Sequence, residues 1–158
     1  MTRIVASIEA RMGSSRLPGK MLMLLAGQPV LAHLTSRMMM CNNLDGLIIA
    51  TTDNPADDAI ADWAAANGIA CFRGNEDDVL ARVLAAQVSM HSDVVVELCG
   101  DTPFLDPAVV DTAIEAWNSH DVDLVTTARN RAYPDGQDVE IFSIQALSDI
   151  DARCKDAG

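Results

Sequence analysis

The chain has 158 residues, of which 49% are hydrophobic and 22% charged, and these values are typical of one globular domain with a sizeable core. Eleven Lys and Arg residues against 23 Asp and Glu residues give a formal net charge of -12, which argues against nucleic acid or an anionic membrane as a partner. The sequence contains no run of about eighteen apolar residues and no signal-peptide core, so we expect a cytoplasmic protein.

The first predicted element is an apolar strand at residues 4–8, and it leads into a loop rich in glycine and cations. The loop carries Arg11, Arg16 and Lys20 on a chain that is otherwise acidic. Glycines let backbone N–H groups approach an anion closely, while arginine and lysine supply donors suited to phosphate oxygens. The loop therefore predicts a site for a polyanionic small molecule. The alternative is a solvated loop after an edge strand.

This loop matches neither of two common nucleotide-binding motifs. Five residues separate Gly13 from Gly19, one more than a Walker A loop has, and Met21 stands where that motif requires Ser or Thr. The dinucleotide fingerprint G-x-G-x-x-G is absent as well. An ATPase and a dinucleotide-dependent dehydrogenase are therefore disfavoured.

Helices and strands alternate through the rest of the chain. Strands are predicted at residues 46–52, 69–72, 93–101, 124–127 and 138–142, and helices from Pro29 to about residue 41, at 56–67, 77–90 and 108–119, with a last helical piece after Ser143. Helices of this length between strands predict a parallel sheet with helices on both faces.

Polar side chains stand at the ends of several predicted strands. Ligands of such sheets bind beyond the carboxyl ends of the strands, where Thr52, Arg73 and Asp101 would meet the cationic loop. Asp101 is the first candidate ligand for a magnesium ion that accompanies a triphosphate. The alternative is that residues 100–103 form a turn with an Asx bond. Asp106, before Pro107, is predicted to cap the next helix.

The cysteines and histidines do not form a predicted site. The four cysteines are widely spaced without a C-x-x-C pair, and Cys71 and Cys99 fall within strand patterns. Reduced core thiols are therefore expected rather than disulfides or zinc ligands. The three histidines share no spacing that indicates a catalytic base.

Together these segments resemble the cytidylyltransferase family that makes CMP-activated sugars. Its members include CMP-acylneuraminate synthetases, CMP-3-deoxy-manno-octulosonate synthetases and the SpsF-like spore-coat polysaccharide proteins. Residues 10–20, ARMGSSRLPGK, resemble the family's phosphate loop, and residues 100–107, GDTPFLDP, resemble its magnesium motif. Residues 51–53 resemble the end of its second strand. Residues 72–80 and 133–140 are similar to segments of the SpsF-like branch.

The resemblance implies a three-layer α/β/α nucleotidyltransferase fold, Rossmann-like and with a mainly parallel sheet. It also implies transfer of CMP from CTP to a sugar or sugar acid, with release of pyrophosphate. The catalytic set would be Arg11, Arg16 and Lys20 on the phosphates and Asp101 on Mg²⁺. The nucleotide would contact residues of the loop and of two strand ends, namely Ala10, Arg11, Gly13, Ser14, Arg16, Lys20, Thr52 and Arg73. For Arg73 the alternative is a surface ion pair with Glu76 or Asp77.

The sequence departs from the family in its length. Complete members continue well beyond the segment at residues 138–140, so residues 1–158 are expected to form a single nucleotidyltransferase domain without the family's C-terminal segment. The acceptor and a second metal ligand, at Asp138, Glu140 or beyond, are left open, and a homodimer is considered.

Two other functions also remain open. One is a nucleotidyltransferase for a sugar 1-phosphate or a cofactor precursor, although residues 10–14 lack the paired glycines usual in those enzymes. The other is a nucleotide-binding fragment without catalysis.

Overall fold

A six-stranded sheet forms the middle layer of the computed structural model, which describes residues 2–129 and 132–156. The strand order is β5–β4–β1–β6–β8–β7, and the bounds are β1 Ile4–Glu9, β4 Gly46–Thr52, β5 Ala70–Gly74, β6 Val94–Cys99, β7 Leu124–Thr126 and β8 Glu140–Ser143. Strands β5, β4, β1 and β6 are parallel, whereas β8 runs antiparallel to both β6 and β7. The prediction of a mainly parallel sheet is confirmed.

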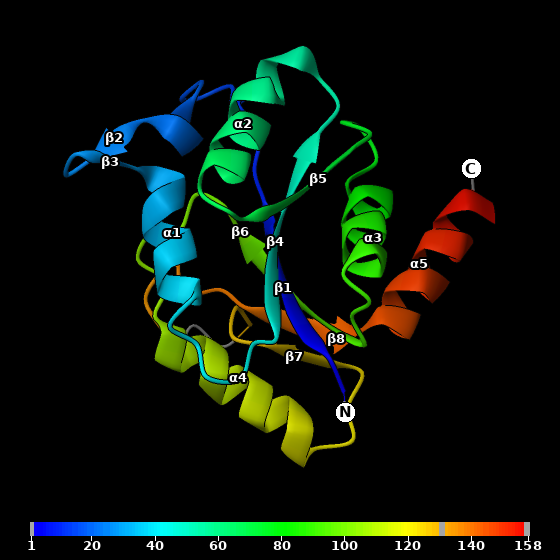
Figure 1. Ribbon diagram of the computed structural model, residues 1–158. Coiled ribbons are helices and arrows are strands. Elements are labelled where there is room, and N and C mark those ends of the chain that lie inside the picture. The colour runs from blue at the N-terminus through cyan, green and yellow to red at the C-terminus, as the bar shows by residue number, and fades with distance from the viewer. Residues whose placement is uncertain (1, 130–131, 157–158) are drawn as a thin grey trace.

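Helices cover both faces of this sheet (Figure 1). They are α1 Val30–Met38, α2 Asp58–Ala66, α3 Val79–Ser89, α4 Pro107–Ser119 and α5 Ile144–Asp156, with short 3-10 turns η1 Lys20–Leu22 and η2 Pro55–Asp57. Helices α1, α2 and α4 pack on one face, and α3 and α5 lie side by side on the other. The result is the predicted three-layer α/β/α arrangement. Among the described helices, none combines the length and apolar character needed to cross a bilayer.

Each face of the sheet has its own hydrophobic core. One core joins the strands to side chains such as Leu31, Ile60 and Ile114, and the other joins them to Val83 and Leu147. Because the central strands are covered on both sides, they are almost continuously apolar rather than alternating. This explains why the central strands could be predicted from the sequence as apolar runs.

A small hairpin near the start of the chain was not predicted. Strands β2 Leu24–Leu25 and β3 Gln28–Pro29 pair antiparallel. Ala26 and Gly27 form the connection, with φ of 49° and 85°, as the two-residue turns of tight hairpins require. Two-residue strands carry no readable periodicity, and Pro29 instead suggested the start of the helix that follows.

Several predicted boundaries shift by a few residues. Helix α1 ends at Met38, α2 is preceded by the turn η2, and α3 begins at Val79 after its cap Asp78, whose side chain accepts the N–H of Ala81. Asp106 caps α4 by accepting the N–H of Ala108 at 3.0 Å, as predicted. The last helical piece proves to be a full helix of thirteen residues.

The cysteine prediction is half right. All four cysteines are free thiols, and Cys71 is half-buried against the core. Cys99, however, is exposed at the end of β6, so its assignment to the core was wrong. A run of apolar residues predicts a strand, but it does not show whether the last residue of that strand is still covered by the helices.

Another cysteine, Cys41, has a perturbed thiol. Burial raises the pKa of Cys41 to about 12, with the charges of Asp111 and Asp106 adding to the effect.

Candidate functional site

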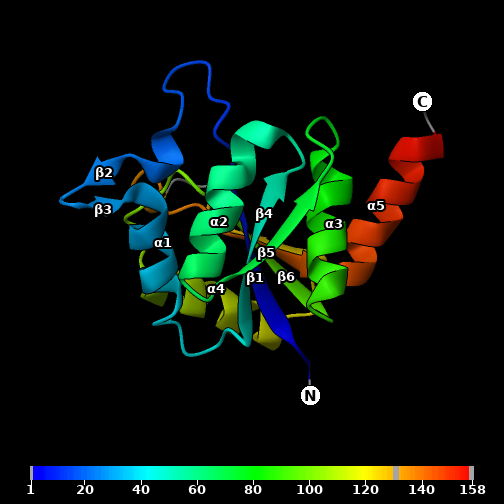
Figure 2. The same ribbon diagram turned by 45° about the horizontal axis from the view of Figure 1, so that its top comes forward.

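The cationic loop projects beyond the carboxyl end of β1, away from the N-terminal end of the strand (Figure 2). Its base is closed by the Gly19 N–H, which donates to the Met12 carbonyl at 2.9 Å. Gly19 has a φ of 75°, a conformation that favours glycine. Arg11 and Arg16 are exposed on this loop. The geometry leaves their guanidinium groups available to a ligand.

A buried carboxylate holds the first half of the loop. Asp57, which is 2% exposed, accepts the N–H of Met12 at 2.6 Å and the hydroxyl hydrogen of Thr52. Sequence reasoning missed this residue, because an acid in the first turn after Asn54-Pro55 has the ordinary appearance of a helix start. Thr52 does lie at the end of β4 as expected, but it is buried and its hydroxyl donates to Asp57.

A second carboxylate meets the other end of the loop. The Lys20 ammonium donates to the carboxylate of Asp101, and the two side chains are 23% and 45% exposed. The turn after β6 is closed instead by Thr102, whose hydroxyl donates to the Cys99 carbonyl at 2.7 Å. Among the described residues the Asp101 side chain makes no Asx bond, so the structure has the turn of the alternative but not its Asx bond, and the metal contact of Asp101 stays a prediction.

Gly100 makes this meeting possible. Its N–H donates to the Glu9 carbonyl at 2.9 Å, and a Cβ at this position would lie 2.4 Å from that same oxygen. Only glycine lets the end of β6 pass so close to the end of β1. This close approach places Asp101 beside the loop that follows β1.

The other two loop cations differ in their surroundings. The Arg11 guanidinium lies 3.7 Å from the Glu76 carboxylate, which also accepts a hydrogen bond from the Asn54 amide at 2.8 Å. Within the described residues Arg16 forms no ion pair. Exposed contacts of this length are worth little in water, so an incoming anion can replace them.

Arg73 has a different set of contacts from those predicted. Its guanidinium pairs with Asp58 at 2.6 Å and donates to the backbone carbonyls of Thr52 and Asn54, both at 3.0 Å. The expected surface partners, Glu76 and Asp77, were therefore wrong. Arg73 ties the end of β5 to the end of β4, and its contact with a nucleotide stays a prediction.

The predicted residues thus fall into two groups. Lys20 and Asp101 are in direct contact and, with Arg11, Gly13, Ser14 and Arg16, form the loop side, of which Ser14 and Lys20 are half-buried and the others exposed. The Ser14 hydroxyl accepts the Leu17 N–H at 3.3 Å. The second group supports the loop from beneath and comprises the buried Ala10 and Thr52, together with the half-buried Arg73.

The arrangement suits a polyphosphate that brings a divalent cation. Three cations and a glycine-containing loop can neutralise phosphate oxygens. Among the described residues, no three His, Cys, Asp or Glu side chains cluster to hold a metal. Asp101 could therefore hold a metal only together with ligand oxygens and water. This fits Mg²⁺, which is commonly bound by one or two carboxylates plus substrate phosphates.

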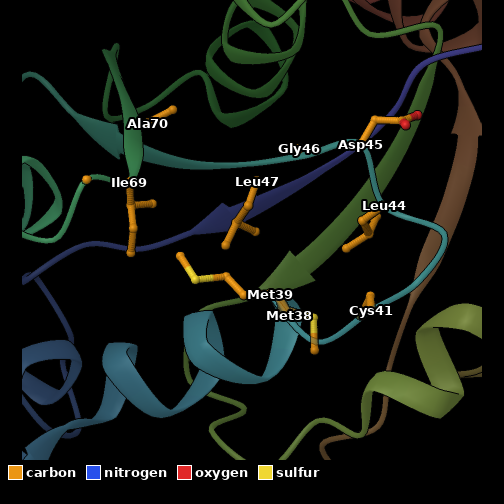
Figure 3. Close-up of a pocket in the computed structure, with 10 residues that line it drawn as sticks. Met38, Met39, Cys41, Leu44, Asp45, Gly46, Leu47, Ile69 and Ala70 are labelled. Carbon is orange, nitrogen blue, oxygen red and sulfur yellow. The ribbon is translucent and has the colours of Figure 1, made fainter.

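A cavity of about 310 Å³ lies at the opposite, amino end of the sheet (Figure 3). Met39, Leu47 and Ile69 point into it, between the end of α1 and the starts of β4 and β5. The acid in its wall, Asp45, accepts the N–H of Ile4 at 2.8 Å. The cavity is therefore separate from the cationic loop, and the Asp45 carboxylate is hydrogen-bonded to the backbone.

Comparison with known proteins matches this sequence to one family. A family model described as cytidylyltransferase matches residues 5–157. The spore coat polysaccharide biosynthesis protein SpsF of Bacillus subtilis (strain 168) is 38% identical over 120 residues, covering 73% of this chain and 50% of SpsF. A 3-deoxy-manno-octulosonate cytidylyltransferase of Anaeromyxobacter sp. (strain Fw109-5) is 37% identical over 131 residues, covering 82% of this chain and 52% of the relative.

A solved structure agrees at the level of the fold. The cytidylyltransferase from Leptospira borgpetersenii serovar Hardjo-bovis (strain JB197) superposes with a TM-score of 0.90 at 29% identity, covering 96% of this chain and 65% of that one. The chain thus spans about half the length of the two sequence relatives, and somewhat more of the solved one.

Proposed function

The chain belongs to the cytidylyltransferase family, and from this we propose that it transfers CMP from CTP to a sugar or sugar acid and releases pyrophosphate. The observation that carries the proposal is the contact between Lys20 and Asp101 at the base of an exposed cationic loop. It supports the proposal because a cation suited to phosphate oxygens lies beside a carboxylate suited to a metal ion. The SpsF relative, named for spore coat polysaccharide biosynthesis, supports a role in surface polysaccharide or glycan biosynthesis.

The loop would bind the triphosphate. Arg11 and Arg16 are exposed, and Lys20 is held only by an exchangeable pair, so all three can turn toward the β- and γ-phosphates. Backbone N–H groups around Gly13 and Ser14 would add donors without steric obstruction. Neutralising these oxygens makes pyrophosphate a better leaving group, because charge grows on it as the bond to the α-phosphorus breaks.

The transfer requires positioning more than a protein nucleophile. The acceptor hydroxyl attacks the α-phosphorus, its proton passes to solvent or a nearby carboxylate, and pyrophosphate leaves. Holding both reactants in line converts an encounter of two molecules into a reaction within one complex. Asp101 would hold Mg²⁺, which when bound supplies positive charge to the phosphate oxygens. Asp57 and Gly100 contribute by fixing the loop and the Asp101 turn.

The proposal extends to the organisation of the chain and its surroundings. We propose that residues 1–158 act as one nucleotidyltransferase domain. Because CTP is a cytoplasmic metabolite, the proposed reaction belongs in the cytoplasm. A homodimer stays a prediction.

Nucleotide selectivity tests the proposal. We expect CTP with Mg²⁺ to raise the melting temperature more than ATP or GTP does, with a stabilisation of about 2.7 kcal/mol at a hundredfold excess over Kd. Pyrophosphate release on adding a panel of sugars would then distinguish turnover from binding. Equal shifts with all three nucleotides would leave only a triphosphate site and refute the cytidine assignment.

A further inference from the structure

Gln137 ties the segment that follows β6 to a turn near the end of the chain. It is the last residue of the turn at residues 134–137, the late turn, which precedes β8. Its Nε2 donates to the Phe104 carbonyl at 2.9 Å, and its Oε1 accepts the N–H of Asp106 at 2.8 Å. A glutamine amide has one acceptor oxygen and one donor nitrogen, and here both are bonded to the backbone of one short segment. Gln137 therefore fixes residues 104–106 at two points.

The late turn is itself fixed to the sheet. The Thr127 hydroxyl donates to the Gln137 carbonyl at 2.8 Å and accepts the N–H of Val139, also at 2.8 Å. The Thr127 N–H donates in turn to the Val139 carbonyl at 3.1 Å. Thr127 directly follows β7, and the fully buried Val139 directly precedes β8. The amide of Gln137 is therefore held by two strands of the sheet rather than by a free loop.

Two overlapping turns join residues 104–106 to Asp101. The Leu105 N–H donates to the Thr102 carbonyl at 3.2 Å, and the Thr102 hydroxyl donates to the Cys99 carbonyl at 2.7 Å. Asp101 lies between Cys99 and Thr102 in the chain. A shift of the segment would therefore pass through Thr102 to the backbone of Asp101.

A second contact brings the late turn against the turn after β6. Gly136 has a φ of 87°, and a Cβ at this position would lie 3.9 Å from Cγ2 of Thr102, which is an ordinary van der Waals distance. No other side chain of residues 132–139 hydrogen-bonds to residues 101–106, and the structure describes both of these segments. Gln137 is therefore the polar side-chain link between the two turns.

The place of the Asp101 carboxylate depends on its backbone once a nucleotide binds. Among the described residues, this carboxylate has one hydrogen-bond partner, the Lys20 ammonium, which we expect to turn toward the phosphates. The position of Asp101 is then set by the turn that carries it. Because Mg²⁺ demands near-ideal octahedral geometry, a small displacement of that turn would weaken the metal site.

We propose that Gln137 is a positioning residue for the metal, because it fixes the turn that carries Asp101 after Lys20 has turned to the phosphates. The inference rests on the proposed function and adds a residue to its site. Gln137 touches neither the metal nor the nucleotide and acts through Asp101. Its loss therefore weakens Mg²⁺ binding and leaves the contacts between the cationic loop and the triphosphate unchanged.

The test is Gln137→Met, which removes both hydrogen bonds and keeps the length of the side chain. CTP is titrated by calorimetry with and without Mg²⁺. The affinity without Mg²⁺ should be unchanged, while the gain in affinity on adding Mg²⁺ should fall about tenfold, as when a residue that supports a metal ligand is replaced. Gln145→Met is the matched control and should change neither quantity, because the Gln145 amide is exposed and donates to Asp149 on α5.

A second comparison separates positioning from a general loss of stability. Gln87→Met removes a buried amide on α3 that is hydrogen-bonded to the Val5 carbonyl and to the hydroxyls of Ser7 and Ser92. It should lower the melting temperature more than Gln137→Met does, because buried partners are left unsatisfied. At a temperature where every variant is folded, however, Gln87→Met should keep the Mg²⁺-dependent gain of the wild type.

Three outcomes would overturn the proposal for Gln137 alone. The first is a Mg²⁺-dependent gain in Gln137→Met equal to that of the wild type, and the second is an equal loss of CTP affinity with and without Mg²⁺. The third is an equal fall of the gain in Gln87→Met, which would assign the effect to stability. A wild type that fails to bind CTP would instead refute the proposed function, and the role of Gln137 with it, so the two failures are distinguishable.

Discussion

Two carboxylates hold the cationic loop, one near each end, and they differ in burial and in the partners that they accept from. Asp57 is buried, and its oxygens accept from a backbone N–H and from a hydroxyl. Asp101 is 45% exposed and meets one mobile ammonium, that of Lys20. The first contact is costly to break, because its donors would be stranded away from water. The second can be exchanged for water, metal or phosphate at little cost.

The contrast shows that burial distinguishes the residues that fix the loop from the residues that can exchange their partner for a ligand. A residue that must release its partner when a ligand arrives has to lie where solvent can replace that partner. A residue that fixes the loop has to be where solvent cannot. By this criterion Asp57 and Thr52 fix the loop, and Lys20 and Asp101 are the residues that we propose contact the ligand.

Replacing Asp57 tests the stronger of the two sets of contacts. Asp57→Ala strands the Met12 N–H and the Thr52 hydroxyl, at a cost of about 1–3 kcal/mol for each buried group. We expect the free energy of unfolding, measured by urea denaturation, to fall by about 2–6 kcal/mol. Asp101→Ala is the control and should cost under about 1 kcal/mol. Similar losses in the two variants would show that both carboxylates are structural.

Replacing Lys20 should affect the ligand rather than the fold. Lys20→Ala removes a charge-assisted contact to phosphate, worth about 1.5–3 kcal/mol, so CTP affinity measured by calorimetry should fall tenfold or more. The unliganded melting temperature should barely change. Lys155→Ala removes another exposed lysine, paired with Asp151 on α5, and should alter neither quantity. If Lys20→Ala unfolds the chain, Lys20 belongs to the scaffold. Arg16→Ala should behave as Lys20→Ala does.

Neutralising Asp101 should remove only the metal-dependent part of the affinity. Asp101→Asn keeps the size of the side chain but removes the charge that Mg²⁺ requires. CTP titrated without Mg²⁺ should bind as in the wild type or slightly more tightly, because an anion beside the triphosphate is gone. The gain in affinity on adding Mg²⁺ should disappear. The exposed Asp123→Asn serves as the control. Equal Mg²⁺ dependence in Asp101→Asn and wild type would move the metal to Asp138 or Glu140.

Glu97 offers the smallest effect and extends the comparison to a third acid, which is largely buried and accepts the Ser7 hydroxyl hydrogen. Burial raises its pKa well above the ordinary value of 4.5, so the folded chain retains a proton that the unfolded chain releases. Stability should therefore fall as pH rises from that ordinary value through the raised one. Urea denaturation at several pH values should show this decline. Glu97→Gln should flatten it, whereas Glu115→Gln should not; a decline that persists in Glu97→Gln would assign it to other groups.

The sequence predicts best those features that lie within one segment. The central strands are apolar runs, so their positions and the parallel sheet could be predicted, and with them the convergence of Asp101 on the cationic loop. Asp106 could be identified as a cap because its partner is two residues away. The strands and the cap need only neighbours along the chain, and the convergence of Asp101 follows from the rule that ligands of such sheets bind beyond the carboxyl ends of the strands.

Features that depend on pairing across the sheet could not be predicted. Glu97 lies between Ser7 and Glu140 only because the three residues are in register across neighbouring strands, and a shift of one residue would turn Glu97 to the other face. The link from Asp57 to Met12 spans 45 residues. Arg73 pairs with Asp58 rather than with Glu76 or Asp77, because its partner depends on how β5 lies against β4.

The reversed direction of β8 has a geometric consequence for anything joined to this domain. Because β8 runs from the carboxyl end of the sheet to the amino end, α5 must run back again, and its last turn lies at the same end as the cationic loop (Figure 2). A flexible peptide fused after α5 would therefore start from the side of the molecule at which we propose that the nucleotide binds. Such a tether would hold an attached sugar or reporter at a high effective concentration over the site, provided its length matches the distance to be spanned.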